Sequence, residues 1–455
     1  MNSAATLRLN GVNRRIFVAA TAVTVSMATV KLVAVFKELT VASAYGRSDA
    51  LEAFLLAALI PGLMINLISE SMNQALIPAL VRVREQEGRE SAQRLLSNSM
   101  LSTCVMLVAG SAIMAASARL LFPVIGSHFS AAKLDLTIRL FYGLLPVIVL
   151  TGIASSCAAV LNTAGEFAIP AIAPIVTPLA FMAFVPLLAR TTGPWAMVYA
   201  MIAGAVIHTA WMAIKMNSQC YPLRFRWYGM NDDTREVARQ FGPVMLSGLV
   251  ASSGLVVDHA MAAMLPAGSL SALAYAGRFV GVALALLGGG VSAAVTPMFS
   301  EMVASRDWQG CGRSLRMWAW SSVSAATLVA LFLIASSRLL VRLTLEHGVF
   351  GREDTAAVSP VLMMYAIQIP FFVCSRIFYR FLVVMRRADI VFYCGLLNLA
   401  LDVILNFVLM RWLGVAGIAL ATSLWTVSTL IFLWYWSRKV LLRVSETFST
   451  VRGSD

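Results

Sequence analysis

The sequence predicts an all-α polytopic membrane protein, with about twelve transmembrane helices in two six-helix lobes around a central cavity. Three observations lead to this fold class. Apolar residues make up 59% of the 455 residues and charged residues only 13%, against about 25% charged in an ordinary globular protein. The apolar runs are about 20 residues or longer, whereas the strands of a membrane barrel alternate in runs of about ten. The basic residues gather in short loops between the runs, which is the positive-inside pattern.

The composition also excludes several other classes of protein. The formal charge of +13 is explained by these basic loops, so we expect no nucleic-acid partner. The six cysteines are scattered without a C-x-x-C pair, so neither a disulfide framework nor a zinc site is expected. The first apolar run continues past Lys31 and Lys37 without a small-residue cleavage site, which predicts an uncleaved first helix.

The apolar runs define the expected spans. An even number of spans places both termini on one side, and the Lys and Arg distribution predicts that this side is the cytoplasm. In chain order the expected spans are residues 16–45, 51–81, 96–117, 137–162, 168–189, 194–215, 240–266, 270–300, 317–340, 358–384, 390–411 and 415–437.

Two polar segments divide these spans. Residues 82–94 alternate in charge sign, which predicts a solvated helical link. Residues 216–239 form the longest polar interruption and mix basic with aromatic side chains, a composition suited to the headgroup interface: Arg224, Phe225, Arg226 and Trp227. We therefore expect an N-terminal lobe at 1–225, and a C-terminal lobe at 226–455 that ends in a short cytoplasmic tail.

The two halves resemble each other. Pro78 ends the second span and Pro297 ends the eighth, an interval of about 220 residues that also separates Glu38 from Asp258. Transporters often contain such repeats, with the substrate site between them near the middle of the membrane. The pattern predicts alternating access.

Charged residues inside apolar spans are the first candidates for a site. Each costs several kcal/mol in hydrocarbon unless it faces water, a partner or a substrate. The first span carries Lys31, Lys37 and Glu38, and the second carries Glu52 and Glu70. Lys31 and Glu38 are seven residues apart and so share one helix face. We interpret this face as the wall of a polar cavity.

Several motifs resemble a known family. The most specific is Asn162-Thr163 followed by Ile169-Pro170-Ala171-Ile172-Ala173-Pro174; others are Gly242-Pro243 and the segment from Gly268-Ser269-Leu270-Ser271 to Tyr275-Ala276-Gly277-Arg278. Over residues 16–440 the chain resembles the MurJ (MviN) lipid II flippases of the multidrug/oligosaccharidyl-lipid/polysaccharide (MOP) exporter superfamily. The resemblance implies a monomeric transporter, not an enzyme, that moves an undecaprenyl-diphosphate-linked saccharide across the bacterial cytoplasmic (inner) membrane during peptidoglycan synthesis.

The functional residues of that family carry over in part. Lys31 and the Lys37-Glu38 pair match an Arg and an Arg-Asp pair in the first helix, and Glu52 matches an Asp that opens the second. Arg278 is kept, although Gly277 replaces the Asp before it. A pair of arginines is lost at Ile65 and Asn66. Lysine offers a point charge instead of a bidentate fork, so phosphate geometry is read less strictly. The family usually has fourteen helices, against about twelve expected here.

These residues suggest specific roles. Lys31, Lys37 and Arg278 are the expected cations for the diphosphate. Arg376 is a further cavity-facing candidate, while Arg380 on the same face of the tenth span can snorkel to the cytoplasmic interface. The acids Glu38, Glu52 and Asp258 are candidate gate latches or ion sites. The alternative for all of them is ion pairing that only holds helices together.

A polar stripe on the eleventh span carries Asp402 with Asn398 and Asn406 one turn away on either side. It is a candidate sodium site, and helix–helix hydrogen bonding is the alternative. No cofactor is expected, although transport can be coupled to membrane potential, H⁺ or Na⁺.

Other functions remain open at this level. An exopolysaccharide or O-antigen repeat-unit flippase would need the same cations, while a cation-coupled drug exporter would favour acids and aromatics. A membrane-embedded glycosyltransferase usually needs a larger extracytoplasmic loop than this chain has. A purely structural role is the fourth alternative.

Overall fold

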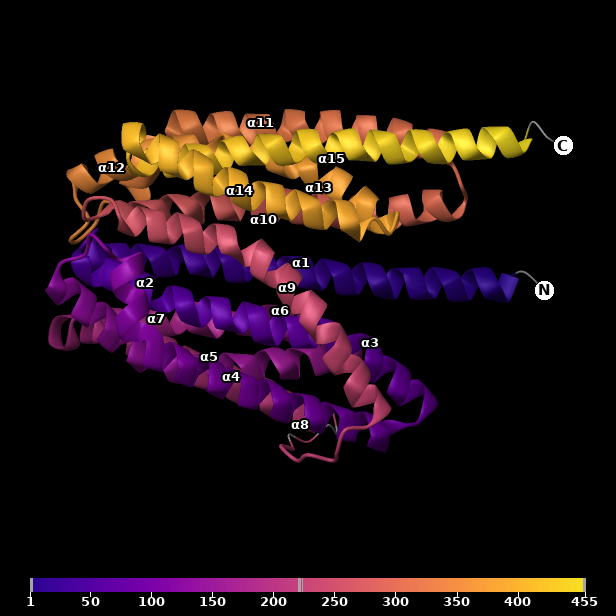
Figure 1. The fold of residues 1–455 in the computed structure, drawn as a ribbon, viewed down its shortest axis with the longest axis horizontal. Helices are drawn as coiled ribbons and strands as arrows, with labels where there is room; N and C mark the ends of the chain where they lie inside the picture. Colours follow the sequence, from indigo (N-terminus) through magenta and orange to yellow (C-terminus); the bar gives the residue numbers. More distant parts are fainter. Residues whose placement is uncertain (1–2, 220–221, 223, 453–455) are drawn as a thin grey trace. The chain divides into compact units, whose positions relative to one another are not determined.

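The structure is a computed structural model, and it describes residues 3–219, 222 and 224–452 (Figure 1). The chain forms two compact units. Unit 1 consists of Met1–Ala44 and Ala53–Leu249, and unit 2 of Tyr45–Glu52 and Val250–Asp455. The division at Leu249 and Val250 lies inside a helix, whereas the sequence places the lobe boundary in the preceding loop, at 225/226.

The regular secondary structure of the described residues is entirely helical. Within them, eleven segments are long and apolar enough to cross a membrane, and α1 (Ser3–Tyr45) is a further long helix. Each expected span overlaps one of these helices or one broken helix. The predicted class, an all-α polytopic membrane protein, is confirmed.

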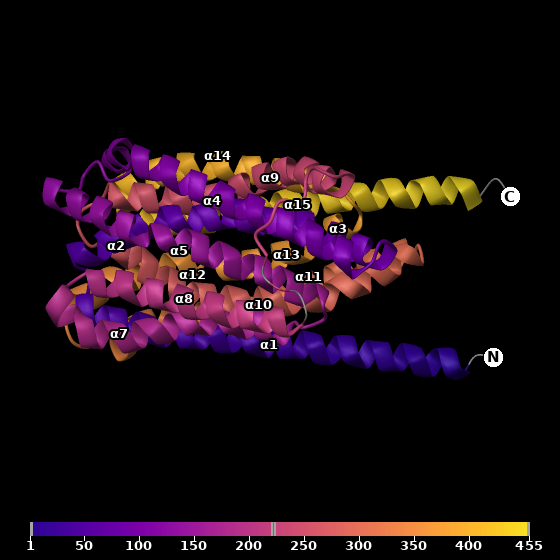
Figure 2. The same cartoon turned by 90° about the horizontal axis from the view of Figure 1, so that it is seen from below.

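Unit 1 is built around α5, which packs against α4 and α8, while α7 packs along α8 (Figure 2). Leu95, Leu96 and Leu161 are fully buried in its core. The helices that follow α1 in this unit are α2 (Asp49–Met64), α3 (Ser71–Gln86), α4 (Arg89–Ile125), α5 (Ala131–Thr163), α6 (Ala168–Ile172), α7 (Val176–Thr192) and α8 (Trp195–Ser218).

Unit 2 is built around α13, which packs against α10, α11 and α15 (Figure 1). Its core includes Phe299 and Phe381, whose ring centroids are 5.5 Å apart. The helix α9 (Asp232–Ala263) belongs to both units. The others in unit 2 are α10 (Ser269–Ala304), α11 (Trp308–Leu345), α12 (Arg352–Ala366), α13 (Gln368–Val384), α14 (Ala388–Leu413) and α15 (Val415–Arg452).

Several spans are interrupted, and the break between α6 and α7 has a local cause. Proline removes a backbone donor and clashes with the preceding turn, and Pro170 and Pro174 lie in the broken segment where α6 passes through a 3₁₀ turn, Ala173–Ile175, into α7. Between α2 and α3 the chain forms a π-helix, Ile65–Glu70, which the sequence did not predict. Such segments are rare and occur frequently at functional sites.

The last helix extends further than expected. The predicted final span ends at residue 437, but α15 continues as a helix to Arg452. The predicted short tail is therefore a continuation of the last helix.

Candidate functional site

The charged pair on α1 is formed. Lys37 Nζ lies 2.9 Å from Glu38 Oε1 and 4.8 Å from the ring centroid of Phe181 on α7. Lys31 is exposed and forms no ion pair with any residue that the structure describes. Of these two lysines, Lys37 is neutralised and Lys31 is available.

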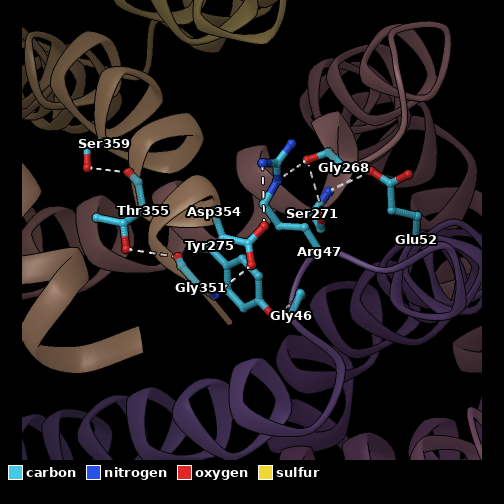
Figure 3. A network of polar contacts seen from close by, with 10 residues as sticks. All are labelled: Gly46, Arg47, Glu52, Gly268, Ser271, Tyr275, Gly351, Asp354, Thr355 and Ser359. Atoms are coloured by element: carbon cyan, nitrogen blue, oxygen red, sulfur yellow. Dashed lines mark hydrogen bonds and ion pairs between the residues drawn. The ribbon is translucent and has the colours of Figure 1, made fainter. Parts of the chain in front are cut away.

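The turn between α1 and α2 docks into unit 2, where Glu52 meets the start of α10 (Figure 3). The Glu52 side chain is 1% exposed, and its Oε1 accepts a hydrogen bond of 3.2 Å from the backbone N–H of Ser271. A carboxylate at this position accepts from the backbone N–H groups that have no partner within α10, and it faces the positive end of the α10 dipole. The structure therefore places Glu52 in a helix-capping contact.

Arg47 fixes the same turn from its other side (Figure 3). Its Nε donates to the Gly268 carbonyl at 3.0 Å, and its guanidinium lies 3.6 Å from Asp354. Gly268 has φ +88°, and a Cβ atom there would collide with the Arg47 guanidinium. Only glycine suits this backbone and this close approach. Tyr275 completes the contact by donating its hydroxyl to the Gly46 carbonyl at 2.9 Å.

A buried acidic cluster joins three helices of unit 2. Asn406 on α14 donates its Nδ2 to Asp258 Oδ1 on α9, at 2.8 Å, and to Asp402 Oδ1, at 3.1 Å. Thr422 on α15 donates to Asp258 Oδ2 at 3.4 Å. The two carboxyl groups are 7% and 2% exposed, and neither forms an ion pair with a basic side chain among the described residues.

This cluster has unused acceptors. Asp402 Oδ2 and Asn406 Oδ1 are buried without a hydrogen-bond partner among the described residues. Gly254, one turn before Asp258, leaves room beside Asp402, because a Cβ atom there would lie 3.4 Å from Oδ2. Two buried carboxyls without a cationic partner require a proton or a bound cation. Asn398 lies apart from the cluster, since its Oδ1 accepts from Thr429 at 2.9 Å.

The two predicted arginines of unit 2 lie on different helices. Arg278 is exposed on α10, and Arg376 is half-buried on α13. The Arg376 guanidinium lies over the rings of Phe372 and Tyr379, at 5.4 and 5.3 Å. Arg380, which was expected to snorkel to the cytoplasmic interface, lies over the same Tyr379 ring at 5.9 Å. Its spacing of four residues from Arg376 is the signal that pairs them.

A further polar group lies in unit 1 around Glu70, a charged residue of the second expected span. Ser155 on α5 donates to Glu70 Oε1 at 3.2 Å and accepts from Asn73 Nδ2 at 2.7 Å. Glu70 ends the π-helix and is exposed. A carboxylate in the middle of an apolar span was the available signal.

The segment predicted to lie at the headgroup interface is held on α4 by two buried side chains. Ser97 donates to the carbonyls of Arg224 and Arg226 and accepts from the Arg226 N–H. Asn98 donates to the Gly229 carbonyl and accepts from the Tyr228 N–H. Phe225 and Trp227 are left 46% exposed. Hydrogen bonds to Ser97 and Asn98 thus hold the backbone of this segment on α4, while its aromatic and basic side chains face outward.

This arrangement of long apolar helices is that of a known class of transporter. An inward-facing multidrug resistance MATE family transporter of the MOP superfamily superposes with a TM-score of 0.76 at 14% identity, over 92% of this chain and 99% of that one. A lipid II flippase MurJ in an inward closed conformation gives a TM-score of 0.80 at 20% identity, over 93% and 89%. The fold is therefore that of a MOP-type membrane transporter.

The sequence comparison identifies the family within that class. The family model described as lipid II flippase MurJ matches residues 41–451, so the chain belongs to the MurJ family. A probable lipid II flippase MurJ of Buchnera aphidicola subsp. Acyrthosiphon pisum is 23% identical over 448 residues, covering 92% of this chain and 84% of that protein. The lipid II flippase MurJ of Burkholderia cenocepacia is 24% identical over 347 residues, covering 73% and 66%. The resemblance stated from the motifs is confirmed.

Proposed function

We propose that this protein is a flippase that moves an undecaprenyl-diphosphate-linked saccharide, of the lipid II type, across the bacterial inner membrane by alternating access. The family match over residues 41–451 carries this conclusion. A flippase moves its substrate without making or breaking covalent bonds, so the protein is a transporter and not an enzyme. Its partners are the lipid-linked substrate and the surrounding membrane lipids.

The physical problem of this transport is the headgroup. A diphosphate and a polar glycan must cross about 30 Å of hydrocarbon, and burying them there without partners would cost far more than binding returns. Fixed cations along a hydrated route solve this problem. In our proposal Lys31, Lys37 and Arg278 are the cations that receive the diphosphate.

Glu38 has a defined part in this scheme. Its contact of 2.9 Å with Lys37 neutralises that lysine while no substrate is present, and an arriving diphosphate competes with the carboxylate for the ammonium. Glu52 has a different part, because it is engaged at the start of α10. We assign it to holding the turn between α1 and α2 and not to the headgroup.

The acidic cluster supports coupling to a cation. Asp258, Asp402, Asn406 and Thr422 offer an oxygen-rich, buried group with a net negative charge, which suits Na⁺ or a proton. A bound cation supplies the positive charge that the cluster lacks. Within the described residues no group of three or more His, Cys, Asp or Glu could hold a metal ion, so the donors fit a monovalent cation better than a zinc-type centre.

Complementation tests the transport proposal. Lys31→Ala, Lys37→Ala and Arg278→Ala should each fail to support growth of a strain depleted of its lipid II flippase, while remaining at wild-type levels in the membrane. The matched control is Lys215→Ala, which should complement. Lys215 lies in the last turn of α8, with its Nζ 3.9 Å from Glu166. Growth with all three cavity variants would contradict the proposal. Rescue only of a strain lacking an exopolysaccharide flippase would change the assigned saccharide.

The topology is also a proposal. Both termini are placed in the cytoplasm by the distribution of Lys and Arg, and the protein is taken to act as a monomer. Labelling of single cysteines introduced at Ser48 and Ser91 with an impermeant maleimide tests the orientation. Ser48 should react from the periplasmic side and Ser91 only in inverted vesicles.

A further inference from the structure

Helix α13 carries two arginines on one stripe of its surface. Arg376 and Arg380 are four residues apart and share a face, with Tyr379 beside them. Their guanidinium carbons lie 5.3 and 5.9 Å from the centroid of that one ring. Phe372 supports Arg376 from the preceding turn, at 5.4 Å. The aromatic side chains thus hold two like charges close together inside a membrane span.

Among the described residues, no acidic side chain forms an ion pair with these two arginines. Within the same part of the chain, the Nε atoms of both are buried without a hydrogen-bond partner. Stacking on a ring uses the face of a guanidinium and leaves its N–H edges free. Like charges one helical turn apart also repel. A multidentate oxyanion would satisfy such N–H edges and offset the repulsion.

Helix α10 passes close to the pair. Helix α10 passes α13 with three consecutive glycines, Gly288 to Gly290. A Cβ atom at Gly288 would lie 3.1 Å from Phe372 and 3.8 Å from Arg376 Cγ, while Cβ atoms at Gly289 and Gly290 would meet nothing within 4 Å. An arginine that faced lipid chains here would be too costly. We therefore expect the stripe to face water or an anion and not lipid chains.

The pair also lies at a different depth from Arg278. Gly288, which is level with Arg376, follows Arg278 by ten residues on α10, or about 15 Å at 1.5 Å per residue. This displacement is toward Ala304, the end of α10 that the proposed topology places in the cytoplasm. Unit 2 thus carries two cationic positions at two heights.

We propose that Arg376 and Arg380 form a loading subsite, which binds phosphate oxygens of the lipid-linked diphosphate on the cytoplasmic side before the headgroup reaches Arg278. This inference rests on the proposed function and adds to it a defined order of binding. The two guanidinium groups donate hydrogen bonds from their N–H groups to the anion, and the Tyr379 ring holds both beside it. Binding removes the repulsion between the two arginines, so the subsite is occupied most favourably by a doubly charged group.

Binding measurements on the purified full-length protein in detergent test the subsite. The probe is undecaprenyl diphosphate, with undecaprenol as the uncharged reference and phosphatidylglycerol as the ordinary anionic lipid. Arg376→Gln and Arg380→Gln should each weaken undecaprenyl diphosphate binding about tenfold, equivalent to about 1.4 kcal/mol, and leave undecaprenol binding unchanged. Arg376→Lys should recover part of the loss, because it keeps the charge but not the fork.

Arg411→Gln is the matched control. Arg411 also stacks on an aromatic ring, that of Phe407 at 3.9 Å, but it stands alone in the last turn of α14. It should bind the diphosphate like the wild type. An equal loss in Arg411→Gln would overturn the subsite, as would an equal loss of phosphatidylglycerol binding in the α13 variants.

Thermal unfolding separates binding from a structural role. Removing a charge that has no partner should leave the melting temperature of the ligand-free protein unchanged or raise it, while the rise produced by undecaprenyl diphosphate should shrink. A lower ligand-free melting temperature in both glutamine variants, with normal diphosphate binding, would show that the arginines only support the fold. If the wild-type protein binds undecaprenyl diphosphate no better than undecaprenol, the proposed function itself fails. If Arg278→Ala weakens binding but the α13 variants do not, only the subsite fails.

Discussion

Asn98 on α4 gives a prediction whose size follows from the structure. Its side chain is 1% exposed and makes three hydrogen bonds that hold the segment before α9 together with the first turn of that helix. Its Nδ2 donates to the Gly229 carbonyl at 2.9 Å and to Thr234 Oγ1 at 3.2 Å. Its Oδ1 accepts from the Tyr228 N–H at 2.7 Å. Asn98→Ala removes all three.

Each such bond contributes about 1 kcal/mol net, so the free energy of opening this segment should fall by about 3 kcal/mol. At 1.4 kcal/mol per factor of ten, the open fraction rises by about 150-fold. Arg224 and Arg226 are exposed in the segment and supply trypsin sites. When opening and closing are fast relative to cleavage, the cleavage rate follows the open fraction.

The assay is trypsin digestion of inverted membrane vesicles, with the fragment cut between residues 224 and 227 followed over time. Ser102→Ala is the matched control, because the Ser102 hydroxyl bonds only to the Asn98 carbonyl of its own helix, at 2.8 Å. Asn98→Ala should be cut about two orders of magnitude faster than Ser102→Ala. A change below about fivefold would refute the reasoning.

Three further predictions concern unit 2. Gly254→Ala places a methyl group 3.4 Å from Asp402 Oδ2. It should reduce the extra melting temperature that NaCl gives over KCl, without lowering the melting temperature in KCl. An undiminished sodium effect would argue against a cation between Asp258 and Asp402. Glu52→Ala should lower the free energy of unfolding by about 1–2 kcal/mol, since it removes the carboxylate at the positive end of the α10 dipole. Glu52→Gln still accepts a hydrogen bond from Ser271 and should lose less stability. Equal melting temperatures for both variants and the wild type would contradict the capping role. Tyr379→Leu should weaken undecaprenyl diphosphate binding severalfold, while Tyr379→Phe keeps the ring and should bind normally. An equal loss of binding in both variants would assign the role to the hydroxyl and not to the ring.

The sequence alone determined the fold class and nearly all of the helices. Apolar runs long enough to span a bilayer are a property of local composition, and in hydrocarbon the backbone must satisfy its own hydrogen bonds. The spans of residues 96–117 and 317–340 therefore lie inside α4 and α11 without further information. The motif at Asn162 to Pro174 was likewise sufficient to indicate the family.

Local pattern could not supply contacts between distant residues. The spacing of Asn398, Asp402 and Asn406 indicated a single polar stripe, but the structure joins only Asp402 and Asn406 to Asp258, 144 positions away from Asp402 in the numbering. Nothing in the α1 sequence shows that Lys37 lies against Phe181. Such pairs depend on which helices pack together, which periodicity does not encode.

The backbone conformations that depend on neighbours were also outside the reach of the sequence. The π-helix at Ile65–Glu70 contains no proline or glycine to announce it. The pairing of Arg376 with Arg380 was visible as a spacing, yet only the structure showed that both guanidinium groups lie beside one ring and that no acid among the described residues pairs with them. Composition determined that the apolar segments cross a membrane. Tertiary structure decided which buried charges have partners, because those partners come from other helices.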